Sequence, residues 1–134
     1  MTTTVQSALQ VKNLMPSFTV DDLQQSMRFY ENLGFGIEER WEENGVLLGV
    51  MLRAGNARIG LNQDDWKKGR DRVKGVGMRL FLETAQNIDE VASRAKQSGI
   101  ALDADPHDTP WGNRAFEVTD PSGYKLTVGS PQPA

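Results

Sequence analysis

The chain of 134 residues has no cysteine and only one histidine, His107. Without cysteine it can form no disulfide framework, no cysteine-ligated zinc or iron–sulfur site, and no thiol nucleophile. Because most hydrolytic and metal-dependent mechanisms use histidine as a base or a ligand, a single histidine leaves little room for them. A chain of this length buries roughly two-thirds of its unfolded surface, so it can fold without such cross-links.

Long apolar runs and an excess of positive charge are missing as well. The longest apolar stretch, residues 46–52, is interrupted by Gly49 and falls short of the ~18 residues of a membrane-spanning helix. The first residues show no basic, then apolar, targeting pattern, so we expect a cytoplasmic protein. With 15 Lys and Arg against 18 Asp and Glu, the net charge is −3, which argues against nucleic-acid and membrane partners. No phosphate-binding glycine loop or nucleophile elbow occurs either.

The residues that are present repeat one order of elements twice. Alternating apolar residues over 14–20 predict a strand, helical spacing predicts a helix over 23–33 that stops at Gly34, and strands follow at about 35–42, 45–53 and 57–62. The second half predicts a strand over 78–83, a helix from 88 to about 98 that stops at Gly99, and strands near 100–104, 113–119 and 124–128. These are two βαβββ modules.

We therefore expect an α+β fold in a single domain, 1–134, with modules at about 12–62 and 76–129 joined by a charged surface loop, 63–75. Each helix would cover one face of its sheet, and two curled mixed sheets would surround a concave cavity. Alternation assigns the faces of the strands. The predicted helix side comprises Leu14, Pro16, Phe18, Val20, Met78, Leu80 and Leu82, and the predicted cavity side comprises Met15, Ser17, Thr19, Arg58, Gly60, Asn62, Arg79, Phe81, Glu83, Lys125 and Thr127.

Four strings in order connect this pattern to a known family: FTVDD at 18–22, FYENLGF at 29–35, PWGNRAF at 110–116 and DPSG at 120–123. Together they resemble the vicinal oxygen chelate superfamily of glyoxalases, bleomycin resistance proteins and extradiol dioxygenases, over about residues 12–129. The resemblance implies the tandem βαβββ fold. It does not by itself imply one function, because the same scaffold binds, isomerises and oxidises.

Enzymes of the resembled superfamily generally hold a divalent metal with His, Glu or Gln at four positions, two in each module. The matching positions here are Met15, Gly60, Arg79 and Thr127, with Met78 as the alternative to Arg79. None of these is a usual ligand for zinc, iron, manganese or nickel. We therefore expect no metal and no cofactor.

Without metal ligands, the chain is most similar to the bleomycin resistance proteins, which sequester an antibiotic in a groove between two subunits. Pro16 beside Met15 and the segment 110–112 match features of those proteins. The resemblance implies a homodimer that binds a small hydrophobic or aromatic ligand. A net charge of only −3 and the position of Arg79 depart from the pattern and favour an anionic group on the ligand.

Individual candidate residues have a structural and a functional interpretation. Arg79 could form an ion pair with Glu83 or Glu117, or anchor an anionic ligand group. Trp111 on its Pro–Gly loop and Trp66 among linker charges could stack on a ligand or merely pack. His107 could be a base or simply solvated. The predicted ligand-binding set comprises Arg79, Trp111, Trp66, Met15, Met51, Phe81, Glu83 and Glu117.

Three hypotheses follow. The first is a metal-free small-molecule-binding protein. The second is a glyoxalase-like lyase or isomerase, or a dioxygenase-related enzyme, with atypical or absent metal ligands. The third is a structural role without a ligand.

Overall fold

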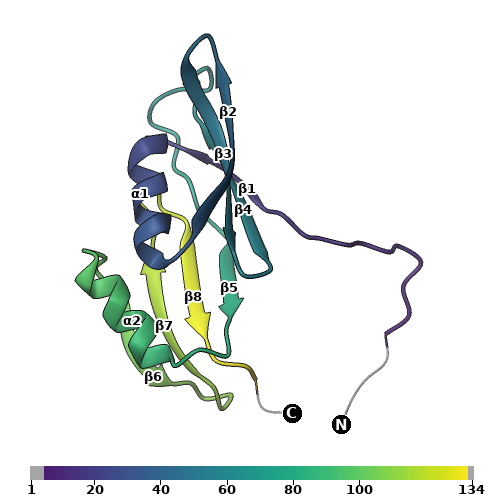
Figure 1. Ribbon diagram of the computed structural model, residues 1–134, viewed down its shortest axis with the longest axis vertical. Helices are drawn as coiled ribbons and strands as arrows, with labels where there is room; N and C mark the ends of the chain where they lie inside the picture. Colours follow the sequence, from purple (N-terminus) through teal and green to yellow (C-terminus); the bar gives the residue numbers. More distant parts are fainter. Residues whose placement is uncertain (1–4, 133–134) are drawn as a thin grey trace.

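The computed structural model describes residues 5–132, and the first module forms the upper part of the molecule in Figure 1. Its elements are β1 (Ser17–Val20), α1 (Leu23–Leu33), β2 (Gly36–Glu43), β3 (Val46–Ala54) and β4 (Ala57–Gln63). The strands form a four-stranded sheet in the order β1-β4-β3-β2, here called sheet A. β1 pairs with β4 in parallel and the other pairs are antiparallel, so the sheet is mixed.

The second module repeats this arrangement. It contains β5 (Arg79–Glu83), α2 (Ile88–Gln97), β6 (Ala104–Asp108), β7 (Arg114–Thr119) and β8 (Lys125–Gly129). Sheet B has the order β5-β8-β7-β6, with a parallel β5–β8 pair and antiparallel neighbours. The expected α+β fold of two βαβββ modules is confirmed. The domain expected over 1–134 also includes residues 1–4 and 133–134, which lie outside the described residues.

Local sequence signals explain where both helices begin and end. The Asp22 side chain accepts a hydrogen bond from the backbone N–H of Gln25, and Asn87 does the same for Glu90, so each helix begins at an N-cap residue. α1 ends at Gly34, which adopts a φ of +123° and donates to the carbonyl groups of Tyr30 and Glu31. These caps set where both helices begin and where α1 ends.

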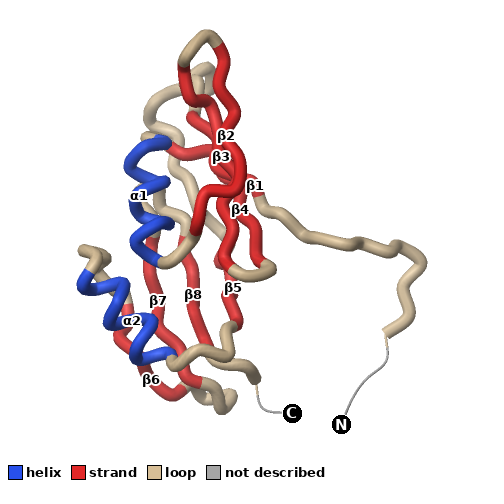
Figure 2. The backbone as a smooth tube through the Cα atoms, viewed as in Figure 1, coloured by secondary structure: helices blue, strands red, loops and turns tan. Residues whose placement is uncertain are grey.

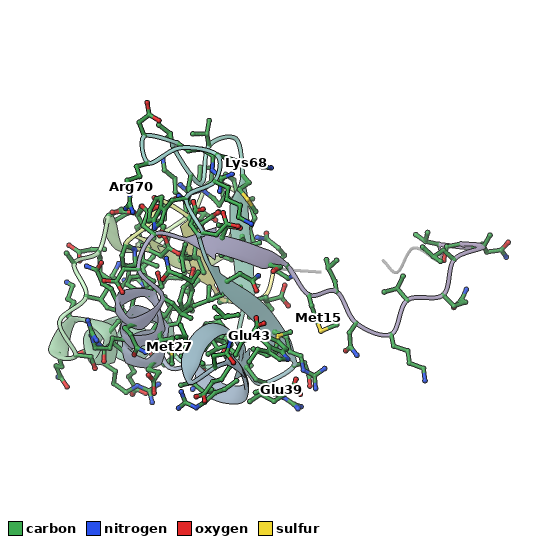
Figure 3. All side chains as sticks on the ribbon, turned by 90° about the horizontal axis from the view of Figure 1, so that it is seen from above. Met15, Met27, Glu39, Glu43, Lys68 and Arg70 are labelled. Carbon is green, nitrogen blue, oxygen red and sulfur yellow. The ribbon has the colours of Figure 1, made fainter. Side chains whose placement is uncertain are left out.

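Three sequence-based assignments are wrong. β1 begins at Ser17, because Pro16 has no N–H to donate to a sheet; residues 5–16 form an extended N-terminal arm that includes exposed Leu14 and Met15 (Figure 3). Met78 precedes β5 and is exposed, so it does not lie on the helix side. The strand expected at 100–104 lies at 104–108, since buried Ile100 instead closes the end of α2 by donating to the Ala95 carbonyl.

Both modules contribute to one hydrophobic core, and the two helices lie on the same side of the sheets (Figures 1 and 2). A set of contacts between modules holds them together at one place. The rings of Phe18 and Tyr124 stack with centroids 4.1 Å apart, the Tyr124 hydroxyl donates to the Thr19 carbonyl at 2.8 Å, and the Tyr30 hydroxyl donates to Asp120 at 2.8 Å. We call Phe18, Tyr30, Asp120 and Tyr124 the inter-module joint.

The charged loop between the modules is not wholly a surface feature, contrary to the expectation. The carboxylate of Asp64 and the ammonium of Lys74 are buried and lie 2.9 Å apart, and Lys74 also pairs with Asp21. Hydrogen bonding by Lys74, with a further hydrogen bond from the Trp66 N–H, holds the pKa of Asp64 below its usual range. The buried Asp64–Lys74 pair thus joins the two ends of the loop, and the Lys74–Asp21 contact fastens the loop to the first module.

Among residues 5–132, neither helix is long and apolar enough to cross a membrane.

Candidate ligand-binding site on the open sheet faces

Each sheet has one face covered by helix and core, and one open face. In β1, Phe18 and Val20 point into the core and Ser17 is exposed, and in β3, Val50 and Leu52 are buried whereas Met51 is partly exposed. Within the described residues of this single chain, the two sheets remain separate and do not close around a cavity (Figures 1 and 2). The open faces are thus where a ligand can approach.

The open face of sheet B carries an exposed aromatic ring beside a polar cluster. Phe81 is 72% exposed although it lies within β5. It pairs in register with Thr127, which in turn pairs with Glu117. Arg79 donates from Nη1 to Thr127 Oγ1 at 3.0 Å and lies 3.6 Å from a Glu117 oxygen. Of the two partners predicted for Arg79, Glu117 is therefore the one that it contacts.

Arg79 also borders a hollow of about 640 Å³ between the start of sheet B and the preceding loop. The ionisable side chains that line this hollow are Lys74, Arg79 and Lys125, and all are cationic. Lys74 is already paired with Asp64 and Asp21, so Arg79 and Lys125 are the cations that a ligand would meet. Opposite charges attract at partly buried positions, so this end of the face suits an anionic group.

The open face of sheet A carries a second aromatic residue, Trp41, which the sequence pattern did not single out as a ligand-binding candidate. A Cβ added to Gly49 would lie 3.2 Å from the Trp41 ring and 3.0 Å from Asn62, so the ring and the amide lie directly over this glycine. Asn62 donates to Ser17 Oγ at 2.6 Å. Trp41, 42% exposed, is held beside a polar pair, as Phe81 is on sheet B. The feature that marks Trp41 as a candidate is the glycine opposite it on the next strand, Gly49, and only the strand register reveals this pairing.

Ion pairs occupy the other end of this face. Glu38 accepts from Arg58 at 3.1 Å and from Arg53 at 3.3 Å. Desolvation acts to raise the pKa of Glu38, but the hydrogen bonds from the two guanidinium groups lower it below its usual range. One carboxylate is therefore shared by two arginines at this end of the face.

The arrangement of two βαβββ modules with open faces can now be compared with known proteins. The model of the Glyoxalase/Bleomycin resistance protein/Dioxygenase superfamily matches residues 11–128. The chain belongs to this superfamily. No curated protein sequence matches the chain.

Solved structures of similar fold cover nearly the whole of this chain. TioX from Micromonospora sp. ML1 is 17% identical with a TM-score of 0.71, covering 90% of this chain and 98% of that one. A Glyoxalase/bleomycin resistance protein/dioxygenase superfamily member from Sphaerobacter thermophilus DSM 20745 is 23% identical with a TM-score of 0.70, covering 91% and 98%. Lactoylglutathione lyase from Agrobacterium tumefaciens is 20% identical with a TM-score of 0.63, covering 90% and 95%. At these identities the likeness shows the fold alone.

In this chain, the residues at the expected metal positions do not fit a divalent metal. Gly60 has no side chain, Met15 lies on the N-terminal arm, and Arg79 brings a cation that is bonded to Thr127. In residues 5–132, no group of three or more His, Cys, Asp and Glu side chains is placed to hold a metal ion. A divalent ion beside Arg79 would meet charge repulsion, and the neighbouring Glu117 carboxylate is already paired with Arg79.

The remaining residues that the sequence singled out lie at separate places in the structure. Trp111 is 60% exposed on the loop between β6 and β7. The Trp66 ring contacts the Lys74 ammonium and the Arg70 guanidinium, each 4.9 Å from its centroid, which is a cation–π contact. Glu83 ends β5 two residues beyond Phe81, and Met51 pairs with Gly60 on sheet A. The His107 Nδ1 lies 2.8 Å from the Asp105 carbonyl oxygen, a backbone contact.

Proposed function

We propose that this superfamily member is a metal-free binding protein for a small molecule with an aromatic or hydrophobic body and an anionic group. The observation that carries the proposal is Phe81, a ring that is 72% exposed on a sheet face next to Arg79, Thr127 and Glu117. An exposed ring beside a few fixed polar groups is the usual composition of a small-molecule site.

Arg79 supplies the polar half of this site. Its guanidinium is held by Thr127 and Glu117, so its orientation is set before a ligand arrives. A ligand carboxylate that replaced one of these contacts could accept two parallel hydrogen bonds from the Arg79 guanidinium. The cationic lining of the neighbouring hollow supports the same preference.

The proposal includes a homodimer in which a second copy covers the open faces. A single open face buries only one side of a ligand, whereas small-molecule sites generally enclose most of it. Exposed Trp41 on sheet A and exposed Phe81 on sheet B would then form the two walls of one cavity. Exposed Met15, with Met51, would add pliable lining, and Trp66 and Trp111 remain candidates for its edges. Sequestration of an antibiotic is one form that this binding could take.

A thermal-shift screen against aromatic carboxylates, their neutral amides and aromatic antibiotics tests this proposal. We expect carboxylates to raise the melting temperature more than the amides, without turnover. Phe81→Ala and Arg79→Gln should weaken the strongest hit about tenfold or more in calorimetric titration, because each removes a direct contact. Arg28→Gln, an exposed arginine on α1 outside both faces, is the matched control.

Two results would contradict the proposal. Equal binding by wild type and both face variants would mean that the ligand lies elsewhere. Turnover of a hemithioacetal, lost in Arg79→Gln, would favour the alternative, a glyoxalase-like lyase or isomerase. Sedimentation equilibrium tests the dimer, and a monomer that binds with full affinity would remove the second copy from the site.

A further inference from the structure

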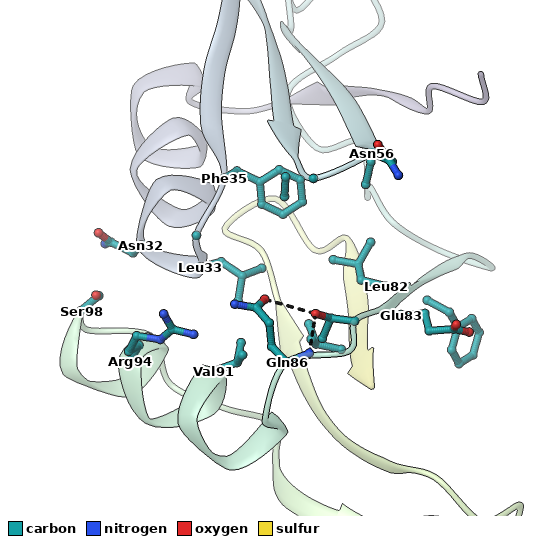
Figure 4. Close-up of a pocket in the computed structure, with 17 residues that line it drawn as sticks. Asn32, Leu33, Phe35, Asn56, Leu82, Glu83, Gln86, Val91, Arg94 and Ser98 are labelled. Carbon is teal, nitrogen blue, oxygen red and sulfur yellow. Dashed lines mark hydrogen bonds between the residues drawn. The ribbon is translucent and has the colours of Figure 1, made fainter. Parts of the chain in front are cut away.

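A second cleft lies between the two modules on the helix side and reaches the open face of sheet B at Phe81. It has a volume of about 770 Å³ and lies between the C-terminal end of α1, the β3–β4 turn, the end of β5 and α2 (Figure 4). The inter-module joint closes the gap between the modules at one place, and this cleft is where the gap stays open. Its volume lies within the ~300–1,000 Å³ of ordinary small-molecule sites.

The floor of the cleft is apolar. Phe35 is buried, and Leu33, Leu82 and Val91 are partly buried and pack against the common core. These side chains come from both modules, so an apolar group inserted here would contact both at once. Removal of that group from water would stabilise the bound state.

Two hydrogen-bond donors face this floor from the second module. The Arg94 side chain points from α2 across the cleft toward the end of α1 (Figure 4). Within residues 5–132, Arg94 takes part in no ion pair. The amide oxygen of Gln86 accepts from the Thr84 hydroxyl at 3.2 Å, which leaves the Gln86 amide N–H groups directed into the cleft.

The charges of the lining define the kind of ligand. Arg94 and Glu83 are the charged side chains that line the cleft, and they lie at opposite ends of it in Figure 4. A guanidinium without a carboxylate partner, next to an apolar floor, suits a carboxylate attached to an apolar chain. The anionic end would lie at α2 and the chain would extend toward Leu82.

We propose that this inter-module cleft is a separate binding site for a small carboxylic acid with an apolar chain, with Arg94 and Gln86 as its carboxylate contacts. The site meets the open face of sheet B at β5, where Phe81 and Glu83 border it together with Leu82, but its two hydrogen-bond donors come from α2 and from the segment that precedes it. It shares Phe81 with the site of the proposed function, but Arg79, Thr127, Glu117 and Trp41 are outside its lining, so its carboxylate contacts are distinct from that site.

Octanoate is a suitable probe, with octanol as its uncharged counterpart. We expect octanoate to bind saturably to the full chain and to shift the backbone NMR signals of Leu33, Phe35, Leu82 and Val91. Arg94→Gln should weaken octanoate on the order of tenfold or more, since a charge-assisted hydrogen bond is lost. Arg28→Gln, at an exposed arginine of α1 outside the cleft, should leave octanoate binding unchanged.

A charge reversal makes the test independent of a simple loss of binding. Arg94→Glu should reject octanoate and accept octylamine, whereas wild type should prefer octanoate. Equal affinity of wild type for octanol and octanoate would overturn the assignment of Arg94. NMR shifts confined to β7 and β8, or octanoate binding abolished by Arg79→Gln, would place the acid on the open face and overturn the proposal without affecting the proposed function.

Discussion

The hydroxyl of Tyr30 on α1 donates a 2.8 Å hydrogen bond to Oδ2 of Asp120, in the turn before β8. Both side chains are buried, so the bond fastens the helix of the first module to a turn of the second. Burial raises the pKa of the Asp120 carboxyl, while hydrogen bonds from the backbone N–H of Tyr124 and from the Tyr30 hydroxyl act to lower it. Asp120 thus depends on these donors for its charge.

Tyr30→Phe should therefore destabilise the chain by about 1.5–3 kcal/mol in urea unfolding, because a buried carboxylate loses a donor. Tyr124→Phe is the matched control: it removes a bond to the neutral Thr19 carbonyl and should cost about 0.5–1.5 kcal/mol. An equal or larger loss in Tyr124→Phe would show that the Asp120 carboxylate does not depend on Tyr30.

Two glycines of the loop before β5 should respond very differently to alanine. Gly75 and Gly77 have φ values of +78° and +77°, so alanine is strained at both by about 1–2 kcal/mol. A Cβ at Gly75 would lie 2.1 Å from the Gly123 carbonyl oxygen, whereas at Gly77 it would meet nothing within 4 Å. Gly75→Ala should thus lose several kcal/mol more than Gly77→Ala in thermal or urea unfolding. Equal losses would mean that the two loops can separate without cost.

Stability should fall in acid partly through Asp64. Because Lys74 lowers its pKa in the folded chain, this carboxylate adds stability that is fully present above its unfolded pKa of ~3.9 and is lost as the pH falls through the lower folded value. Asp64→Asn should be less stable than wild type at pH 7, and the difference should shrink as the pH falls below about 4. Asp65→Asn, at an exposed neighbour, should change little. A deficit for Asp64→Asn that is independent of pH would contradict this account.

Gly49 should determine the position of the Trp41 ring. Alanine there would bring a Cβ within 3.0 Å of the Leu61 carbonyl oxygen and 3.2 Å of the ring, so we expect a loss of about 1–3 kcal/mol and a shifted tryptophan fluorescence spectrum. Gly36→Ala adds a Cβ whose nearest neighbour lies at 3.9 Å, and should alter neither. An unchanged spectrum for Gly49→Ala would mean that the ring does not rest on this glycine.

Chelation should leave the protein unchanged. Since the residues at the four expected metal positions are Met15, Gly60, Arg79 and Thr127, dialysis against EDTA should change neither the melting temperature nor the affinity for an aromatic carboxylate. Elemental analysis after incubation with zinc, nickel, manganese or iron should find far less than one equivalent. Retention of one equivalent of metal would contradict the proposal of a metal-free protein.

The strands and helices could be predicted from sequence to within a few residues where local signals agree. Gly34 and Gly99 end their helices as expected, and alternation correctly places Phe18 and Val20 inward and Phe81 outward. Alternation failed at Leu14, because an apolar pattern does not reveal that Pro16 lacks the N–H needed to continue the sheet. It also failed at residues 100–104, where apolar residues close a helix and edge strand β6 instead contains Pro106.

The parts of the site that depend on strand register could not be predicted. Trp41 became a candidate only when the pairing placed it over Gly49. In the same way, the mixed charges of the linker do not show that Asp64 and Lys74 bury each other, since the two residues meet only when the loop folds back on itself. Arg79 could be singled out because an arginine between apolar residues of a strand is unusual in itself.

The inter-module joint has a mechanical consequence. Phe18, Tyr30, Asp120 and Tyr124 hold the modules together at one place, while the cleft beneath Arg94 leaves them apart at another. We expect that a small rotation about the joint would change the width of the cleft while the hydrogen bonds of the joint stay intact. We therefore expect the largest internal motion of the molecule to be a change in the angle between the two sheets. This motion would also change the relative orientation of Phe81 and Trp41.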